Sequence, residues 1–517
     1  MRSLRIAGSP LTVFIVFLVF YLCTLTSNFT GPHDSLTYMG MLKAEHGLWH
    51  PHHLLYHVTS KYWLGFWKYF FPGVEDYVLV ETFSSVWGAG VLTLAFIFFR
   101  RRFNLPTLTA WLGTAVIGFS YGIWFYSVNV EVYMPSLSFT LLSLYMLTRK
   151  EWSSKHVWRT AVVHSLAILF HQMNILLVPV VLYKIFTQRK NIYVFKSVFW
   201  YGVTGLVLVG GLYFIGGWVI EGNNSFEKWM HWVKGYTQTN EYWQPLSWQT
   251  PVLAGVGFFR SIVGGQFIFQ LEGVQRSLGG FLQSHSLQDE MFLVRGLSQT
   301  TIWILLVLSA ILGVMILILL VKFILQFKQR KRQWGHVITP LLLYILIYSA
   351  YFFFWEPEIV EFWLGQCVML WLLLIGTYIP AGKGVNRIAA LIMLLLLVIN
   401  YTSSLRPMQD IRNDIGYARI EKVKAIAGPK DIVVVEDPWL LKEFLEYYTK
   451  AQIIVANEPK EYAAVLKKAD LTRAAGGKVF IYPDEGRGSK LILPLQQAYG
   501  SRLKVFQQEL ATVYVIE

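Results

Sequence analysis

Apolar runs long enough to cross a membrane recur through most of this chain. A membrane-spanning helix needs ~20 mainly apolar residues, and a chain of 517 residues that is 55% hydrophobic and only 15% charged is too apolar for an ordinary soluble domain. Nine clear runs begin near Leu11, Tyr77, Leu108, Val132, Val198, Thr300, Val337, Glu361 and Arg387. The chain is therefore predicted to be an α-helical polytopic membrane protein.

The segment 157–186 decides the topology, because it can form one long helix or two short helices that meet at His171 and Gln172. Dense basic clusters occur at 100–102, 149–159, 184–196, 322–332 and 383–387. With two helices, every cluster lies on the cytoplasmic side, as the positive-inside tendency requires. We therefore expect about 11 transmembrane helices, the C-terminus outside, and a cavity that opens from the outer face where the two short helices meet.

The net charge of +14 raises the alternative of a nucleic-acid partner. The basic residues stand in short clusters between apolar runs, so membrane topology explains them and no nucleic acid is expected. The two cysteines, Cys23 and Cys367, both lie inside apolar runs and support neither a disulfide framework nor a cysteine metal site.

The chain divides into a transmembrane domain at 1–405 and a soluble domain at 406–517. Outer loops are expected at 27–76, 221–299 and 355–361. The first contains an aromatic segment at 62–71 typical of a membrane surface, and the second an apolar segment at 251–269, interrupted by Arg260, that favours a re-entrant or interfacial element.

The tail from 406 predicts a small extracytoplasmic α/β domain. Strands are predicted at 431–437, 451–457 and 478–485, with helices at 438–450 and 461–477. The tail contains neither a G-x-G-x-x-G motif nor a P-loop, so no nucleotide role is indicated.

The stretch 31–57 is the strongest candidate for chemistry. It contains one aspartate, Asp34, and six of the twelve histidines, and it follows the first apolar run directly. Asp34 is a candidate general base, and the alternative is an N-cap of an interfacial helix. His53 and His57 have the spacing of a two-histidine metal site that His50 could complete, and the alternative is hydrogen bonding to substrate or headgroup phosphate without a metal.

Ionisable residues at membrane depth are costly and usually face a cavity. Glu131, beside Tyr133 at the start of a span, and His171, at the predicted helix break, are site candidates on this ground. A glutamate that reaches the surface and a buried core histidine are the alternatives. The acids Glu356, Glu358 and Glu361 stand among aromatic residues, where they either bind a polar substrate or belong to an interfacial belt.

Three motifs together resemble integral-membrane glycosyltransferases of the GT-C superfamily, protein O-mannosyltransferase-like branch. Asp34 is followed by HPHHLLYH from His50, then by FSYGIWFYSVNVEVY from Phe119, then by LAILFHQMNILLVP around His171. The order and spacing agree over about the first 190 residues. The chain departs from the branch after His50 and Pro51, because His52 and His53 replace the proline and glycine that members of the branch have there.

The resemblance implies a GT-C-like fold and inverting transfer of one sugar from a polyprenyl-phosphate donor to an acceptor on the extracytoplasmic face, with Asp34 as general base. The residues that would bind substrate are His50, His53, Glu131, Tyr133, His171 and Arg260. Arg260 and protonated histidines are the cations expected for the departing phosphate. The acceptor class (protein, lipid or polysaccharide) stays open, no cofactor is expected, and a divalent metal is the alternative.

Two other functions remain open from the sequence. A membrane transporter would also use short helices and intramembrane acids, and a membrane-anchored metal-dependent hydrolase would use the histidine cluster. The expected location is a bacterial inner membrane.

Overall fold

The computed structural model describes residues 8–238, 242–278, 284–378, 383–436, 440–484 and 488–516. The chain forms two compact units. Unit 1 contains Met1–Thr26 and Glu45–Pro407, and unit 2 contains Ser27–Ala44 and Met408–Glu517. The tail therefore packs with a short piece of the first outer loop, which lies far from it in sequence.

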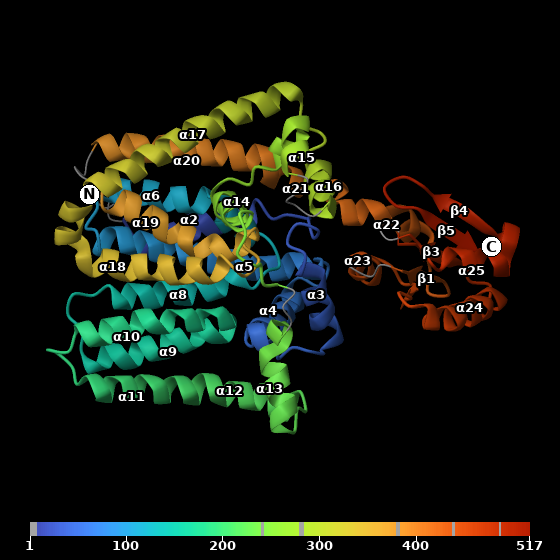
Figure 1. The fold of residues 1–517 in the computed structure, drawn as a ribbon, viewed down its shortest axis with the longest axis horizontal. Coiled ribbons are helices and arrows are strands. Elements are labelled where there is room, and N and C mark those ends of the chain that lie inside the picture. The colour runs from blue at the N-terminus through green and yellow to red at the C-terminus, as the bar shows by residue number, and fades with distance from the viewer. Residues whose placement is uncertain are drawn as a thin grey trace. The chain divides into compact units, whose positions relative to one another are not determined.

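Helices occupy each of the predicted membrane segments of unit 1, and most of them run side by side (Figure 1). They are α2 (Pro10–Leu22), α5 (Asp76–Arg101), α6 (Thr107–Phe119), α8 (Tyr133–Leu147), α9 (Ser154–Phe170), α10 (Val178–Thr187), α11 (Val194–Gly205, continued as a helix to Ile220), α17 (Gln299–Leu325), α18 (Phe327–Phe352), α19 (Leu364–Gly376) and α20 (Lys383–Asn400). The predicted fold class, an α-helical polytopic membrane protein, is confirmed in its helical part.

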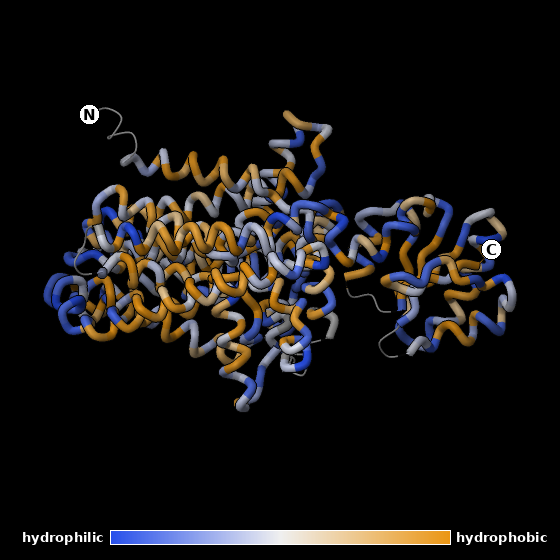
Figure 2. The backbone as a smooth tube through the Cα atoms, turned by 90° about the horizontal axis from the view of Figure 1, so that it is seen from above, coloured by the Kyte–Doolittle hydropathy of each residue, from blue (hydrophilic) through white to orange (hydrophobic). Residues whose placement is uncertain are grey.

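Five of the described helices are individually long and apolar enough to cross a membrane, and α6 with α7 (Tyr121–Ser127) forms a pair bent by 72° that would make a sixth. The shorter apolar helices include α2, α8 and α10. Apolar residues dominate the helices of unit 1, and polar residues gather at their ends (Figure 2). Phe195 on α11 is 92% exposed and Leu325 on α17 is 79% exposed. Such large exposed apolar faces are explained by contact with lipid.

Inside unit 1, small residues allow helices to approach closely. A Cβ atom on Gly88 of α5 would lie 2.1 Å from the Ser127 Oγ of α7, so a larger residue would push the two helices apart. Ser85 Oγ also donates to the Ser127 carbonyl at 2.8 Å. This contact places α5 against the chain that leads into α8.

The predicted outer segments of unit 1 fold into short helices. They are η1 (Pro51–His53), α4 (Tyr56–Phe70), α13 (Phe226–Lys234), η5 (Gly235–Gln238), α14 (Thr250–Ile262), η6 (Gln266–Gln270), α15 (Glu272–Leu278), α16 (Ser284–Leu293) and η7 (Val360–Trp363). The aromatic segment 62–71 lies on α4, and the interrupted apolar segment 251–269 begins with α14. Both segments are helical, and their position at the membrane surface stays a prediction.

Unit 2 is built on a five-stranded sheet in the order β2-β1-β3-β5-β4. The strands are β1 (Ile432–Val435), β2 (Gln452–Val455), β3 (Val479–Tyr482), β4 (Leu503–Gln507) and β5 (Val513–Ile516), and the helices are α3 (Ser35–Ala44), α22 (Ile415–Ile426), α23 (Leu441–Tyr448), α24 (Pro459–Ala474) and α25 (Ile492–Tyr499). The first three strands are parallel and match the predicted ones. The antiparallel pair β4 and β5 was not predicted. Residues 437–439 and 485, which end or begin predicted segments, lie outside the described residues.

A buried aspartate, Asp414, joins the two pieces of unit 2. It precedes α22 and accepts from the backbone N–H groups of Phe29 at 2.6 Å and Thr30 at 2.9 Å. Its other oxygen accepts from the Thr30 hydroxyl at 2.5 Å and the Tyr417 N–H at 3.2 Å. One carboxylate thus caps a helix and holds the segment Ser27–Ala44 onto the tail.

Candidate functional site

The predicted break at His171 is present in the structure. His171 has an extended backbone (φ −157°, ψ 118°), and the short helix η2 (Gln172–Leu177) separates α9 from α10. Asn174 satisfies the end of α9, since its amide donates to the carbonyls of Ala167 and His171, each at 3.0 Å. At membrane depth no water is available for such carbonyls, so a polar side chain must bind them.

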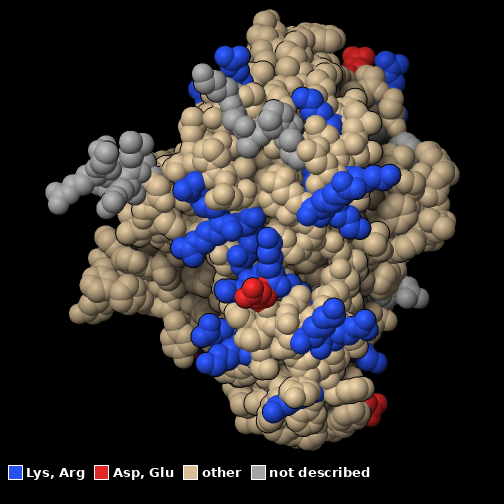
Figure 3. Space-filling model, turned by 90° about the vertical axis from the view of Figure 1, so that its left-hand side faces the viewer, with Lys and Arg blue, Asp and Glu red and all other residues tan. Residues whose placement is uncertain are grey.

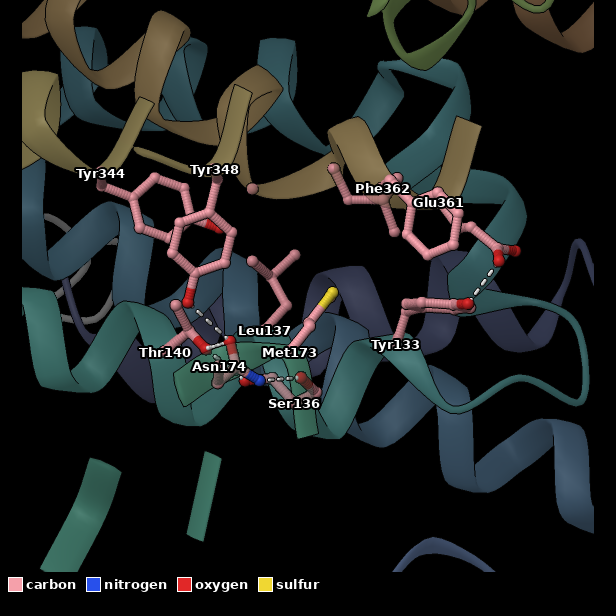
Figure 4. A pocket seen from close by; sticks show the side chains of 12 residues that line it. Tyr133, Ser136, Leu137, Thr140, Met173, Asn174, Tyr344, Tyr348, Glu361 and Phe362 are labelled. Carbon is pink, nitrogen blue, oxygen red and sulfur yellow. Dashed lines mark hydrogen bonds between the residues drawn. The ribbon is translucent and has the colours of Figure 1, made fainter. Parts of the chain in front are cut away.

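Asn174 also links the break to the neighbouring helices (Figure 4). Its amide donates to Ser136 Oγ at 2.7 Å, and its oxygen accepts from Thr140 at 2.7 Å and from Tyr348 at 3.2 Å. The break is therefore held by hydrogen bonds to α8 and α18, and it has a fixed geometry.

Histidines from the first outer loop gather at this break. The ring centroids of His53 and His171 lie 4.6 Å apart, those of His50 and His53 lie 5.4 Å apart, and those of His53 and His57 lie 6.4 Å apart. His53 and His57 are almost fully buried. Three of the predicted site residues, His50, His53 and His171, are thus brought together from distant parts of the sequence.

Burial keeps these loop histidines uncharged near neutral pH. It lowers the pKa of His50 to about 4, and burial together with the neighbouring His50 lowers the pKa of His52 to about 3. The pKa of His53 is lowered by burial and by the surrounding imidazoles. Neutral rings can hydrogen-bond to a phosphate but cannot neutralise it, and a role for the protonated histidines stays a prediction.

No group of three or more His, Cys, Asp or Glu side chains among the described residues has the arrangement of a metal site. The ring of His57, the second member of the predicted pair, packs edge-on against Tyr56 at 5.4 Å between centroids. The histidines lie together as packed rings.

Tyr133 extends the cluster toward an acid. Its ring centroid lies 5.3 Å from that of His171, and its hydroxyl donates to Glu361 of η7. The hydroxyl of Tyr126 donates to the same carboxylate at 3.1 Å. Glu361 therefore belongs to the cluster, although the sequence distinguished it from Glu356 and Glu358 in no way.

Glu131 lies close to Tyr126, the second tyrosine that donates to Glu361. Its side chain is 1% exposed, and it is within electrostatic range of Tyr126 and of Tyr56 on α4. The carbonyl of Glu131 accepts from Ser84 of α5 at 3.4 Å. Glu131 is buried in the protein, so the alternative of a glutamate that reaches the surface is wrong.

A small cavity of about 20 Å³ lies between these groups, with Tyr133, Asn174 and Glu361 in its wall (Figure 4). A cavity of this size holds about one water molecule. A sugar does not fit into it, so a substrate would have to bind elsewhere around the cluster or after a rearrangement.

Arg260, on α14, forms an ion pair with Glu290 of α16 through Nη2. Among the described residues, its buried Nε atom has no hydrogen-bond partner. Tyr121 and Tyr126 are within electrostatic range of its guanidinium. The sequence did not predict the pairing with Glu290, because nothing in the spacing of the two residues indicates contact.

Asp34 belongs to unit 2 and directly precedes α3. Its carboxylate accepts from the Tyr38 hydroxyl at 3.1 Å. The side chain is reached by solvent although protein surrounds it closely, and this environment raises the pKa of the carboxyl above its ordinary value despite the opposing effect of Tyr38. Because Asp34 and the histidine cluster lie in different units, their predicted convergence stays a prediction.

No protein-family model matches the chain, and no curated protein of similar sequence was found. The chain is similar to the solved structure of ArnT from Cupriavidus metallidurans bound to undecaprenyl phosphate, at 11% identity and a TM-score of 0.48, over 98% of this chain and 97% of that chain. The apo state of the same protein gives 11% identity and 0.47, over 98% of each chain. The structure of the arabinofuranosyltransferase AftD from Mycobacteria is similar at 12% identity and a TM-score of 0.42, over 100% of this chain and 40% of that chain.

Proposed function

We propose that the chain is an integral-membrane glycosyltransferase of GT-C type. It moves a sugar from a polyprenyl-phosphate-linked donor to an acceptor at the extracytoplasmic face, with inversion at the anomeric carbon. The observation that carries this proposal is the cluster of His50, His53, Glu131, Tyr133 and His171, of which all but His50 are buried, at the end of the helical unit opposite its basic residues.

The two ends of this unit differ in chemistry along the same helices. Tyr133 begins α8 and Arg149 follows its end, whereas Lys155 lies at the start of α9 and His171 directly follows its end. Lys184 lies on α10, far from the break at His171, and α5 ends with the basic residues Arg100 and Arg101. At ~1.5 Å per residue α5, with 26 residues, is about 39 Å long, enough to cross a ~30 Å hydrocarbon core. The positive-inside tendency favours an inner position for the basic ends, and this supports the proposal that the cluster lies at the outer face.

The proposed reaction uses a carboxylate and a leaving phosphate. An acceptor hydroxyl attacks the anomeric carbon, its proton passes to Asp34, and the bond from that carbon to the phosphate oxygen breaks. A raised carboxyl pKa makes Asp34 a better proton acceptor than an ordinary aspartate. The Nε–H of Arg260 and the neutral histidines are proposed to donate to the departing phosphate.

The test is transfer by the purified full-length protein in proteoliposomes. A panel of polyprenyl-phosphate sugars is offered with protein, lipid and polysaccharide acceptors, and released polyprenyl phosphate and the glycosylated acceptor are measured. Stoichiometric release with one acceptor class, and an inverted anomer by NMR, is expected. Absence of transfer with every donor would contradict the proposal.

A transporter is the second candidate, because the helix broken at His171 is a feature that transporters share. The same proteoliposomes distinguish the two functions. Flux of a sugar or ion without any release of polyprenyl phosphate would favour transport.

A further inference from the structure

The basic end of unit 1 contains cations far in excess of acids. The loops and helix ends at 100–107, 148–159, 184–196 and 322–336 contain many Lys and Arg residues and a single acid, Glu151. Lys and Arg side chains spread across this face, and acidic ones are few (Figure 3). Part of this charge holds the end of α8, since Arg102 donates to the Tyr145 carbonyl at 2.7 Å and Lys184 to the Arg149 carbonyl at 2.5 Å.

Other cations of this face border an open groove. The groove lies at the C-terminal end of α10, has a volume of about 400 Å³, and is lined by Tyr183, Phe186, Thr187, Arg189 and Lys190. We call it the α10 groove. All of its lining residues come from the end of α10 and the turn that follows, so the groove is open on its other side.

Along the chain, the residues that line the groove are first aromatic and then basic. Tyr183 and Phe186 come first, one helical turn apart, and are 38% and 56% exposed. Arg189 and Lys190 follow just after the helix and are also exposed, and neither is in an ion pair with an acid among the described residues. An aromatic wall thus leads from the apolar part of the helix to two cations at its end.

This order matches a phospholipid at a membrane surface. An acyl chain can lie along Tyr183 and Phe186 at hydrocarbon depth, and a phosphate at headgroup depth can meet Arg189 and Lys190. We propose that the α10 groove binds one anionic phospholipid of the cytoplasmic leaflet, with its phosphate on Arg189 and Lys190. The proposal is independent of the reaction at the opposite end of the unit.

Charge complementarity selects an anionic lipid over a zwitterionic one. Lys184, on the same helix α10, and Arg102 lie within electrostatic range of each other and add positive potential to this end of the unit. A headgroup that also contains a cation, such as phosphocholine, has no net charge and is attracted less than a net negative headgroup.

The test uses the full-length protein and counts bound lipids by native mass spectrometry. Phosphatidylglycerol, phosphatidylcholine and inorganic phosphate are titrated separately into protein from neutral detergent. The wild-type protein is expected to retain one phosphatidylglycerol more tightly than phosphatidylcholine. In the double variant Arg189→Gln/Lys190→Gln, the affinity of this site for phosphatidylglycerol is expected to fall about thirtyfold, at ~1 kcal/mol for each basic residue.

The matched control is Lys331→Gln/Arg332→Gln, which removes two exposed cations of the same basic end outside the groove. It is expected to change the affinity by less than about threefold. Phe186→Ala is expected to weaken phosphatidylglycerol and leave inorganic phosphate unaffected. The charge-preserving variant Arg189→Lys/Lys190→Arg is expected to bind like wild type and separates loss of charge from loss of fold.

Three results would overturn the proposal. Equal losses in both double variants would show a diffuse surface charge instead of a site. Equal binding of phosphatidylcholine would remove the role of charge. Displacement of phosphatidylglycerol by inorganic phosphate at similar concentration would show that the groove recognises free phosphate.

Discussion

The rings of His53 and His171 pack edge to face with their centroids 4.6 Å apart. One ring belongs to the short helix η1 of the first outer loop, and the other belongs to the break between α9 and α10. The contact fixes the outer loop on the broken helix, so a change in either residue is expected to disturb the position of the other.

The base assignment predicts that Asp34→Asn nearly abolishes transfer. Loss of a positioned general base costs ~100 to 10,000-fold in rate. Because Asp34 is solvent-accessible, folding is expected to change by less than ~0.5 kcal/mol. Single-turnover transfer and thermal unfolding, measured on the same preparation, check both parts.

The pH dependence of the wild-type protein follows from the same residue. A base works only when it is deprotonated, and the surrounding protein raises the pKa of the Asp34 carboxyl above its ordinary 3.8. The rate should therefore fall as the pH drops through this raised value, at a higher pH than for an ordinary aspartate. A rate that stays constant below pH 4 would contradict the assignment.

Replacement of the buried Asp414 is expected to lower stability, whereas replacement of Asp34 is expected to lower the transfer rate. Asp414→Ala removes the acceptor for the N–H groups of Phe29 and Thr30, so we expect a loss of about 2 kcal/mol or more in the stability of unit 2. Chemical denaturation, followed by the fluorescence of a probe on the tail, measures it. Glu446→Ala, at an exposed ion pair, is the control and should have little effect.

The loop histidines predict acid destabilisation of unit 1. Burial lowers the pKa of His50 to about 4 and that of His57 to about 3. Below about pH 6.5 these histidines are therefore protonated in the unfolded chain but stay neutral in the folded chain. Stability should therefore fall as the pH drops from 6.5 toward 4, by up to ~1.4 kcal/mol per pH unit for each such histidine. Unfolding midpoints of wild type and His57→Asn, compared between pH 7 and 5, test this, and equal slopes would contradict it.

His53→Ala is expected to reduce transfer less than Asp34→Asn does, because a neutral ring can only assist the departing phosphate. Chelators should change the rate little. Restoration of a chelated sample by a divalent ion would instead favour the metal-dependent alternative.

Tyr133 and Glu361 should be energetically coupled. The Tyr133 hydroxyl donates to the Glu361 carboxylate, and a hydrogen bond to a charged group contributes ~1.5 to 3 kcal/mol. A double-mutant cycle with Tyr133→Phe and Glu361→Gln, read by thermal unfolding, measures the coupling. Strict additivity would show that the pair stabilises nothing.

The topology can be tested by labelling single cysteines in a variant without Cys23 and Cys367. A cysteine at Lys190 should be protected from an impermeant reagent added outside, and a cysteine at Ser501 in the tail should react. Reaction at Lys190 would reverse the orientation and place the α10 groove in the outer leaflet.

Most helices of the fold and three of its five strands follow from local features of the sequence. Hydrophobic length and periodicity are local properties, so the membrane helices, the break at His171 and the strands β1, β2 and β3 could all be predicted from them. The strands β4 and β5 were missed because short antiparallel strands near a chain end give a weak periodic signal.

Contacts between groups that are far apart in the sequence became visible only in the folded structure. The packing of Ser27–Ala44 with the tail through Asp414, the ion pair of Arg260 with Glu290, and the place of Glu361 beside Tyr133 depend on side chains that approach across long sequence separations. No local pattern encodes such contacts, because their free energy depends on burial and geometry that exist only after the helices have packed.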